Sequence, residues 1–340
     1  MFRPALFGGV RADLDGQVAV VTGATRGLGF LLARELADAG CPVVVCGRDE
    51  AELRRAEAAL QERGARVLAV ACDVADRPQA ERLVEQATAR FGRVDVLVNN
   101  AGVIQVGPLQ ALRVEDFEQA MAVMFWGALY PTMAVLPQML ERRSGRIVNI
   151  TSIGGKLSAP HLLPYNAAKF AAVGLSEGLR AELAAAGVGV VTVVPGLMRT
   201  GSHVNALFKG DRRREFTWFA LGASLPLVSM DAERAARRIV DATRRNRAEV
   251  ILSPPAQLAA RLHGLAPATL TRLLGLANRL LPSADGVDPG ASRGIELLRE
   301  RPSPLLERLT GMGMAAARRF HQFPGPAVPG EPDARPEARR

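Results

Sequence analysis

The sequence predicts an α/β protein built on a doubly wound parallel sheet of about seven strands. Helices are expected on both faces, and a helical extension at the C-terminus. Three observations predict this class. Apolar runs of strand length alternate with amphipathic stretches of helix length along most of the chain. The apolar runs are rich in Val and Ile without polar alternation, as expected of strands covered on both faces. A glycine-rich turn directly follows the first run.

The individual elements follow from this pattern in chain order. The expected strands are Val18–Thr22, Val43–Cys46, Val67–Ala71, Val94–Asn99, Arg146–Thr151, Val188–Val194 and Glu249–Leu252. The helices expected between them are Gly27–Ala39, Glu50–Arg63, Pro78–Phe91, Val114–Leu140 and Tyr165–Ala185. Strands that alternate with helices in this way indicate a Rossmann-type sheet.

The chain divides into four expected parts. Residues 1–13 form an N-terminal arm and residues 14–255 the nucleotide-binding catalytic domain. Residues 256–323 form an amphipathic helical extension. Residues 324–340 are rich in Pro and charge and are expected to be disordered.

The extension carries a stripe of leucines at helical spacing. Pro267 interrupts this stripe, and three arginines lie off it. Packing against the domain is the favoured interpretation, while a substrate cover, a dimer contact and a peripheral membrane contact stay open. The stripe consists of Leu258, Leu262, Leu265, Leu270, Leu273, Leu274, Ala277 and Leu281, and the arginines are Arg261, Arg272 and Arg279.

Composition and charge exclude several classes of protein. A hydrophobic share of 48% excludes a wholly disordered chain. No run approaches the ~20 uninterrupted apolar residues of a membrane-spanning helix, and no signal peptide is apparent, so we expect a cytoplasmic protein. The net charge of +9 is dispersed, since residues 1–200 hold 21 basic and 20 acidic residues. We therefore expect no nucleic-acid partner.

Cysteine and histidine spacing gives no support for a disulfide framework or a metal site. Cys41, Cys46 and Cys72 lie in or beside apolar runs, and no CxxC pair occurs. The four histidines are scattered, and we interpret them as ordinary surface or loop residues.

The glycine-rich turn is the first candidate binding site. Glycines permit a tight turn and a close approach of phosphate, and the following helix offers free N–H groups to an anion. A merely structural turn is the weaker alternative. The turn reads Thr22, Gly23, Ala24, Thr25, Arg26, Gly27, Leu28, Gly29.

The end of the second strand bears on which dinucleotide binds. Gly47 stands where an acid would hold the ribose 2′-hydroxyl of NAD, and Arg48 follows it. Arg26 can converge on the same ribose, and two guanidiniums favour the 2′-phosphate of NADP(H). Asp49 is interpreted as the N-cap of the next helix. Because arginine is abundant in this chain, a chance occurrence of these two arginines stays open.

Together with the motifs described next, the glycine-rich turn makes the chain resemble the short-chain dehydrogenase/reductase family over residues 14–255. The glycine turn matches that family's coenzyme turn, and Asn99, Asn100, Ala101 and Gly102 match its NNAG motif. The resemblance implies that Asp73, with Val74, contacts the adenine ring. It also implies that Pro195, Gly196 and Thr200 lie near the nicotinamide. The implied coenzyme-binding residues are Gly23, Thr25, Arg26, Gly27, Leu28, Gly29, Arg48, Asp73, Val74, Asn99, Ala101, Gly102, Tyr165, Lys169, Pro195, Gly196 and Thr200.

Tyr165 and Lys169 form a YxxxK pair, which a helix places one turn apart on one face. A cation beside the phenol favours phenolate, so we expect a Tyr165 pKa below its ordinary value of ~10 and a usable acid/base. Lysine is notable here because the chain has only three lysines among 43 basic residues. Ser152 matches the family serine, whose hydroxyl binds the substrate oxygen. The implied catalytic residues are Ser152, Tyr165 and Lys169.

One position departs from the family pattern. Met124 stands where the family has an asparagine that shapes a helix kink and whose backbone carbonyl holds a water of the proton relay. A methionine keeps a carbonyl, so the relay can survive.

The expected activity is NADP-dependent hydride transfer between nicotinamide and a carbonyl or secondary alcohol. A non-catalytic NADP-binding regulator or scaffold of the same fold is the alternative.

Apolar side chains before Tyr165 and over residues 207–221 suit a hydrophobic substrate, although simple packing of these side chains explains them equally well. A homo-oligomer is expected by analogy. A basic run over 209–214 is interpreted as a solvated helix face, while contact with an anionic group of the substrate stays open. The apolar side chains in these two stretches are Leu157, Leu162, Leu163, Leu207, Phe208, Phe216, Trp218, Phe219 and Leu221.

Overall fold

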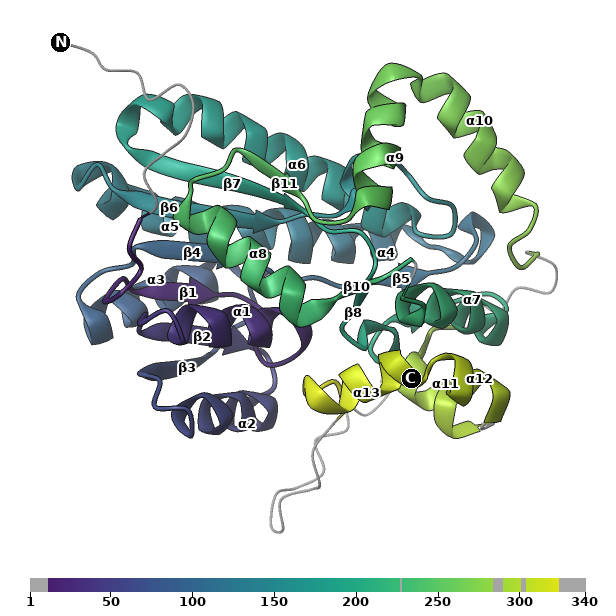
Figure 1. The fold of residues 1–340 in the computed structure, drawn as a ribbon, viewed down its shortest axis with the longest axis horizontal. Coiled ribbons are helices and arrows are strands. Elements are labelled where there is room, and N and C mark those ends of the chain that lie inside the picture. The colour runs from purple at the N-terminus through teal and green to yellow at the C-terminus, as the bar shows by residue number, and fades with distance from the viewer. Residues whose placement is uncertain (1–11, 227, 284–289, 301–303, 324–340) are drawn as a thin grey trace.

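The computed structural model describes residues 12–226, 228–283, 290–300 and 304–323. A seven-stranded parallel sheet forms its centre, with the order β11-β7-β6-β4-β1-β2-β3 (Figure 1). The strands are β1 (Ala19–Val21), β2 (Val43–Gly47), β3 (Val67–Ala71), β4 (Val96–Asn99), β6 (Gly145–Ile150), β7 (Val188–Val194) and β11 (Glu249–Ile251). The predicted strands are thus all present, with ends shifted by at most two residues.

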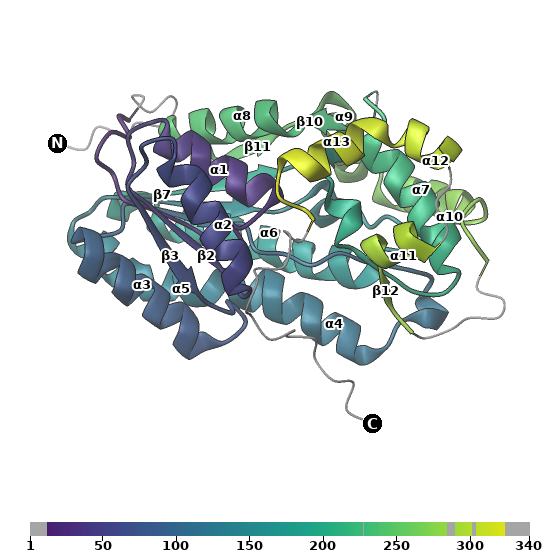
Figure 2. The same ribbon diagram turned by 90° about the horizontal axis from the view of Figure 1, so that it is seen from below.

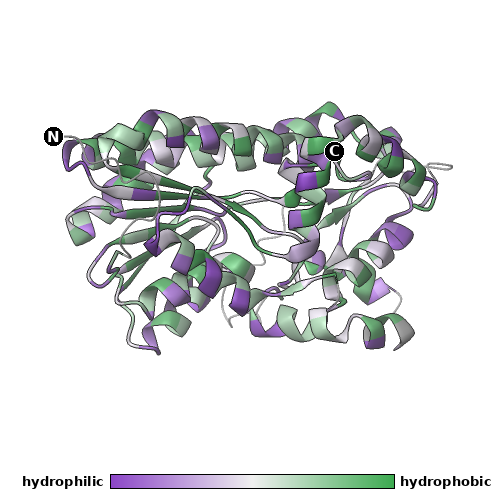
Figure 3. Cartoon of the chain, turned by 45° about the horizontal axis from the view of Figure 1, so that its top comes forward, coloured by the Kyte–Doolittle hydropathy of each residue, from purple (hydrophilic) through white to green (hydrophobic). Residues whose placement is uncertain are grey.

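Helices cover both faces of this sheet, as the sequence predicts. On one face lie α1 (Gly27–Ala37), α2 (Glu50–Gln61) and α8 (Ala232–Arg244), and their apolar residues share one core cluster. On the other face lie α3 (Arg77–Phe91), α5 (Gly127–Glu141) and α6 (Leu163–Leu183). Figure 2 shows α1 and α8 on one side of the strands and α3 and α5 on the other. The strands between them are coloured as hydrophobic in Figure 3.

The long helix expected at 114–140 is interrupted. It consists of α4 (Val114–Met121), a π-helical turn (Ala122–Trp126) and α5. By length and composition, this segment is the one helix of the described residues that could cross a membrane. Val135 and Met139 of α5 are fully buried in the core, which accounts for its apolar character.

The C-terminal extension has two parts with different surroundings. Residues 254–281 contain α9 (Pro254–Leu265), which contacts the domain at its start, and α10 (Pro267–Asn278), which projects away from the sheet in Figure 1. The favoured prediction of packing fails for α10, because none of its residues is buried. By contrast, α13 (Gly311–Arg319) packs on the domain through Ala316, Ala317 and Phe320. Two short helices, α11 (Gly294–Glu300) and α12 (Pro304–Leu309), precede α13.

Two small sheets extend the molecule beyond the carboxyl end of the main sheet. One pairs β8 (Met198–Arg199) with β10 (Met230–Asp231). The other contains β5 (Gln105–Val106), β9 (Leu207–Phe208) and β12 (Ser292–Arg293). The helix α7 (Arg212–Ser224) packs beside them. The predicted arm residues 1–11 and the predicted disordered tail 324–340 lie outside the described residues.

Candidate active site

The expected site residues follow the carboxyl ends of the central strands. Ser152 follows β6, Gly196 follows β7, and the glycine turn joins β1 to α1. The strand order reverses direction between β1 and β4, which are neighbours in the sheet. Such a switch point opens a crevice at the carboxyl edge, where open α/β sheets bind ligands.

Tyr165, Lys169 and Ser152 converge at this edge. Tyr165 and Lys169 lie one turn apart on α6, and the Lys169 Nζ is 5.8 Å from the centroid of the Tyr165 ring. The buried Lys169 Nζ donates a 2.8 Å hydrogen bond to the carbonyl oxygen of Ile150, the last residue of β6. Ser152 Oγ accepts a 3.0 Å bond from the Gly154 amide. The predicted grouping of the three side chains is therefore present in the structure.

The protonation of Tyr165 differs from the expectation. Burial raises the pKa of the Tyr165 phenol, and a hydrogen bond with Ser152 only partly opposes this. Burial also lowers the pKa of Lys169 to about 8. Removal from water is the largest cause, and the expected lowering of the Tyr165 pKa is wrong for this structure. Tyr165 is a neutral phenol at pH 7, which is the form that donates a proton.

The glycine turn is shaped for a close approach. Gly23 has a φ of +62°, and a Cβ there would lie 2.8 Å from Ala101 Cα. A Cβ on Gly29 would overlap the carbonyl oxygen of Gly23. The Asn100 side chain, whose role the sequence did not reveal, donates to the carbonyl oxygens of Thr22 (2.9 Å) and Gly23 (3.1 Å). No side chain caps the start of α1, although the amide of its first residue, Gly27, is already bonded to another part of the chain.

A segment from the far end of the chain also contacts this turn. We call residues 311–323, comprising α13 and the four residues that follow it, the C-terminal strap. The Gly27 amide donates a 2.8 Å hydrogen bond to the carbonyl oxygen of Phe320. Gln322 Nε2 donates to the carbonyl oxygen of Thr200 at 3.1 Å, and the His321 ring lies 4.3 Å from that of Phe30. The strap thus joins the glycine turn to the segment expected near the nicotinamide.

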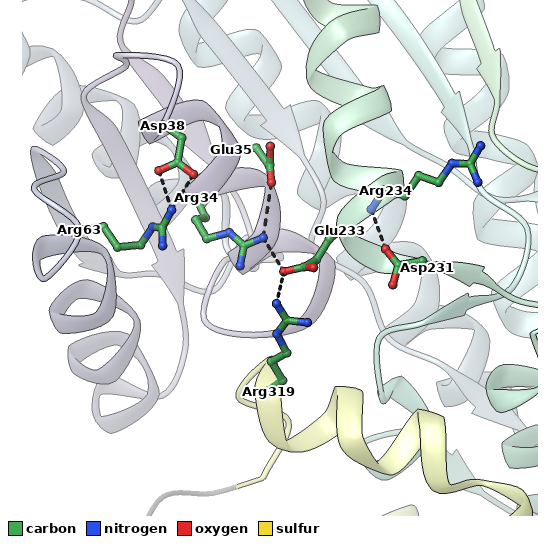
Figure 4. A network of polar contacts seen from close by, with 8 residues as sticks. All are labelled: Arg34, Glu35, Asp38, Arg63, Asp231, Glu233, Arg234 and Arg319. Atoms are coloured by element: carbon green, nitrogen blue, oxygen red, sulfur yellow. Dashed lines mark hydrogen bonds and ion pairs between the residues drawn. The ribbon is translucent and has the colours of Figure 1, made fainter.

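Figure 4 shows how the strap is anchored. Glu233 of α8 lies between Arg319 of α13 and Arg34 of α1, and accepts from each guanidinium at 2.9 Å. The Glu233 and Arg34 side chains are mostly buried, so these ion pairs are partly shielded from solvent. The strap is therefore tied to α8 through Glu233 and, by way of the same carboxylate, to Arg34 of α1.

The two arginines expected at the ribose have acidic partners. Arg26 forms an ion pair with Glu52, and the Thr25 hydroxyl donates to the same carboxylate at 3.0 Å. Arg48 lies 3.9 Å from Asp73. Glu52 lies on the first turn of α2, and Asp49 caps this helix as predicted. Nothing in the sequence indicates that Glu52 pairs with Arg26.

The remaining expected residues occupy the same edge with varied contacts. Asn99 Nδ2 donates to Thr132 of α5 (3.0 Å) and to Asn149 of β6 (2.9 Å), so the side-chain NH2 group is used in bonds within the protein. Asp73 Oδ1 accepts from the Ala75 amide at 3.0 Å, and Val74 is buried. The other expected residues follow β4, β7 or β8, namely Ala101, Gly102, Pro195, Gly196 and Thr200.

Met124 lies in the π-helical turn, so the local distortion persists without the family asparagine. Its buried side chain helps to line a small cavity of about 10 Å³, together with Lys169, Asn149 and Ala101. A cavity of this size is at the lower limit for a single water molecule.

The apolar side chains over residues 207–221 pack mainly against one another. Phe208, Phe216 and Phe219 are buried in edge-to-face contact, with ring centroids 5.3 and 5.9 Å apart. For these three residues, simple packing explains the pattern. Leu162 and Trp218 are half-buried beside them.

Lys209, predicted on a solvated face, is buried and paired with Asp116 at 2.7 Å. The prediction failed because the sequence did not show that α4 supplies this buried acid. Of the histidines interpreted as surface or loop residues, His161 lies in a loop but is buried, and His203 is buried in a 3-10 helical turn. Burial lowers the pKa of His203 to about 4. His161 Nδ1 lies 2.7 Å from Glu215, which also accepts from Trp218 Nε1, so this buried carboxylate joins α7 to the loop before Tyr165.

The predictions about cysteine and metal can also be compared with the structure. Cys41, Cys46 and Cys72 are free and buried, as expected. Among the described residues, no group of three His, Cys, Asp or Glu side chains is arranged to hold a metal ion.

Comparison with known proteins adds to this geometry. A family model for short chain dehydrogenase matches residues 17–208. A putative ketoacyl reductase of Streptomyces coelicolor is 42% identical over 191 residues, which cover 56% of this chain and 73% of that protein.

Two solved structures resemble the fold. A short chain dehydrogenase/reductase of Burkholderia phymatum in complex with NAD has a TM-score of 0.67 and 29% identity, over 74% of this chain and 94% of that chain. A gluconate 5-dehydrogenase of Burkholderia cenocepacia in complex with NADP and tartrate has a TM-score of 0.63 and 27% identity, over 73% of this chain and 97% of that chain. With the family model matching more than half of its length, the chain belongs to the short-chain dehydrogenase/reductase family and is an oxidoreductase of that type.

Proposed function

We propose that the protein catalyses the NADPH-dependent reduction of a carbonyl group on an apolar substrate, with Tyr165 as the proton donor. The observation that carries this proposal is the half-buried side chain of Tyr165 beside Ser152 and the buried Lys169 amine. A non-catalytic binding protein has no need to keep a lysine in a buried position that lowers its pKa to about 8.

The chain's own residues perform binding and proton transfer. A bound nicotinamide coenzyme supplies the hydride. Ser152 Oγ accepts from the Gly154 amide and also hydrogen-bonds to Tyr165, and we propose that it donates its hydrogen to the substrate oxygen once the substrate lies between the two hydroxyls. Tyr165 then donates its proton as negative charge develops on that oxygen. The raised pKa of Tyr165 favours reduction near neutral pH, because the phenol is protonated before the reaction.

The choice of NADP(H) rests on Arg26 and Arg48. Both guanidiniums lie beside the end of β2, where Gly47 leaves no acid to hold a 2′-hydroxyl. Glu52 pairs with Arg26 in this structure, so a 2′-phosphate competes with that carboxylate for the guanidinium. We propose that Arg48, whose side chain is 61% exposed, makes the first contact with the phosphate.

The apolar substrate is inferred from the side chains beyond Tyr165. Leu157 is buried in the loop before it, while Leu162 and Trp218 are half-buried. The similarity to a putative ketoacyl reductase supports a ketone of acyl or polyketide type.

The test is NADPH oxidation by the purified full chain with a series of β-ketoacyl thioesters and cyclic ketones of increasing apolar length. Steady turnover that improves with apolar length, and is faster with NADPH than with NADH, supports the proposal. Tight NADPH binding without turnover across the series would favour the alternative of a non-catalytic regulator or scaffold. The observation that favours this alternative is Met124, which stands where the family has an asparagine of the proton relay.

A further inference from the structure

A pair of helices after the catalytic domain exposes an unusual number of leucines. We call residues 254–281, comprising α9, α10 and the short segment after them, the leucine hairpin. Six of its leucines are between 46% and 88% exposed, with Leu265 and Leu280 the most exposed. Soluble surfaces seldom gather so many large apolar side chains in one segment, and such patches mark interaction sites. The six are Leu258, Leu262, Leu265, Leu273, Leu276 and Leu280.

The leucines lie in stripes. On α9, Leu258, Leu262 and Leu265 follow helical spacing. Leu273, Leu276 and Leu280 continue it on and just after α10. No residue of α10 is buried, so the described part of the chain does not cover this face. Among the described residues these leucines are therefore open to a partner.

The charge on the leucine hairpin has a single sign. Arg261, Arg272 and Arg279 are its charged residues, and residues 250–284 contain no Asp or Glu. Arg272 and Arg279 are seven residues apart and flank the leucine stripe. By comparison, α8 of the same domain mixes Glu233 and Asp241 with its arginines. A partner with apolar depth and negative surface charge fits this arrangement.

The base of the leucine hairpin is fixed to the domain beside the candidate active site. Ala256 is buried, and Gln257 Nε2 donates to the carbonyl oxygen of Ile251 at 2.9 Å. His263 of α9 lies against Phe170, with ring centroids 6.4 Å apart, and Phe170 directly follows Lys169 on α6. Whatever binds the leucine hairpin is thus held next to the helix that carries Tyr165.

We propose that the leucine hairpin docks the protein on the surface of an anionic lipid bilayer. The leucines enter the boundary between headgroups and acyl chains, while the flanking arginines reach the lipid phosphates. A second copy of this chain fits less well. A symmetric pairing of two hairpins would place arginines against arginines with no acid between them. The proposal concerns binding alone and does not depend on the reaction proposed above.

Vesicle flotation of the full chain tests the proposal. Vesicles of phosphatidylcholine alone are compared with vesicles that also contain phosphatidylglycerol. We expect the protein to float with the anionic vesicles at least about fivefold more than with the neutral ones, and less at high salt. The triple variant Leu273→Ser, Leu276→Ser, Leu280→Ser is expected to stay at the bottom of the gradient.

Matched variants separate this role from general effects on the protein. Leu109→Ser removes a leucine of similar exposure (61%) outside the leucine hairpin and is expected to float like the unaltered chain. Arg272→Glu with Arg279→Glu should weaken binding to anionic vesicles, whereas Arg237→Glu on α8 should not. Thermal unfolding of each variant without vesicles checks that it is folded.

Three results would overturn the proposal. The first is that the folded, full chain does not float with anionic vesicles. The second is that the triple leucine variant floats as well as the unaltered chain. The third is a concentration-dependent dimer in sedimentation that the triple variant abolishes, without flotation, which would assign the leucine hairpin to self-association.

Discussion

The amide of Gly27, at the start of α1, donates a 2.8 Å hydrogen bond to the carbonyl oxygen of Phe320 in the C-terminal strap. The chain's far end thus supports the turn that is expected to bind the coenzyme phosphates. Gln322 extends the contact to Thr200, and Asn205 Nδ2 in turn donates to the carbonyl oxygen of Gln322 at 2.8 Å. The strap therefore bonds to two segments that are both expected to bind the coenzyme.

We expect Gln322→Ala to weaken NADPH binding by about fivefold, the effect of losing roughly 1 kcal/mol of buried hydrogen bonding. A fluorescence titration with NADPH measures this. Met312→Ala changes an exposed residue of the same strap and should leave the Kd unchanged. Tighter binding by the Gln322 variant would instead identify the strap as a competitor of the coenzyme.

The coenzyme preference is expected to depend on the Arg26–Glu52 ion pair. Glu52→Gln removes the competing charge, so the ratio of kcat/KM for NADPH over NADH should rise by about threefold to tenfold. Arg48→Ala should lower the same ratio. Glu50→Gln, an exposed change on the same helix turn, is the control. Equal ratios in all three variants would contradict a role for these arginines in recognising the 2′-phosphate.

The buried Lys169 predicts a specific dependence of stability on pH. Its folded pKa of about 8 lies below its ordinary value of 10.5, so the buried ammonium disfavours the folded state at lower pH. The penalty is up to about 3 kcal/mol below pH 8 and disappears as the pH rises to about 10.5. Urea unfolding at pH 7 and pH 9.5 measures it. Lys169→Met should lose this contribution, and an unchanged pH dependence in that variant would show that Lys169 is not its source.

Met124 lines the small cavity that it shares with Lys169. We expect Met124→Asn to raise kcat of carbonyl reduction by a few fold, because a polar side chain helps to hold a water molecule there. Met124→Leu keeps the wall apolar and serves as the control. A lower kcat in the Asn variant with unchanged thermal stability would show that a dry cavity suits this protein.

The central sheet and the pairing of Tyr165 with Lys169 could be predicted because they depend on local patterns, whereas Ser152 was expected beside them from the family resemblance. Buried parallel strands read as continuous Val and Ile runs, and a YxxxK pair on a helix has one geometry. The strands Val67–Ala71 and Val188–Val194 match the prediction in full. The other expected residues follow the carboxyl ends of parallel strands, which meet at the same edge of the sheet.

What could not be predicted depends on contacts between distant segments. Nothing in the pattern around Phe320 indicates that it meets Gly27, and Glu52 gives no local sign that it pairs with Arg26. Lys209 was placed on a solvated face because its neighbours are charged, yet it meets Asp116 from α4. The raised pKa of Tyr165 likewise reflects how deeply the whole site is buried, which a motif does not encode.

The central claim is that the Tyr165 phenol donates the proton during carbonyl reduction. The most direct test compares NADPH oxidation with a ketone substrate by the unaltered chain and by Tyr165→Phe, together with the NADPH Kd of each. We predict that the variant binds NADPH with a similar Kd while kcat falls by at least about a hundredfold. A Tyr165→Phe protein that turns over the ketone at the original rate would contradict the claim.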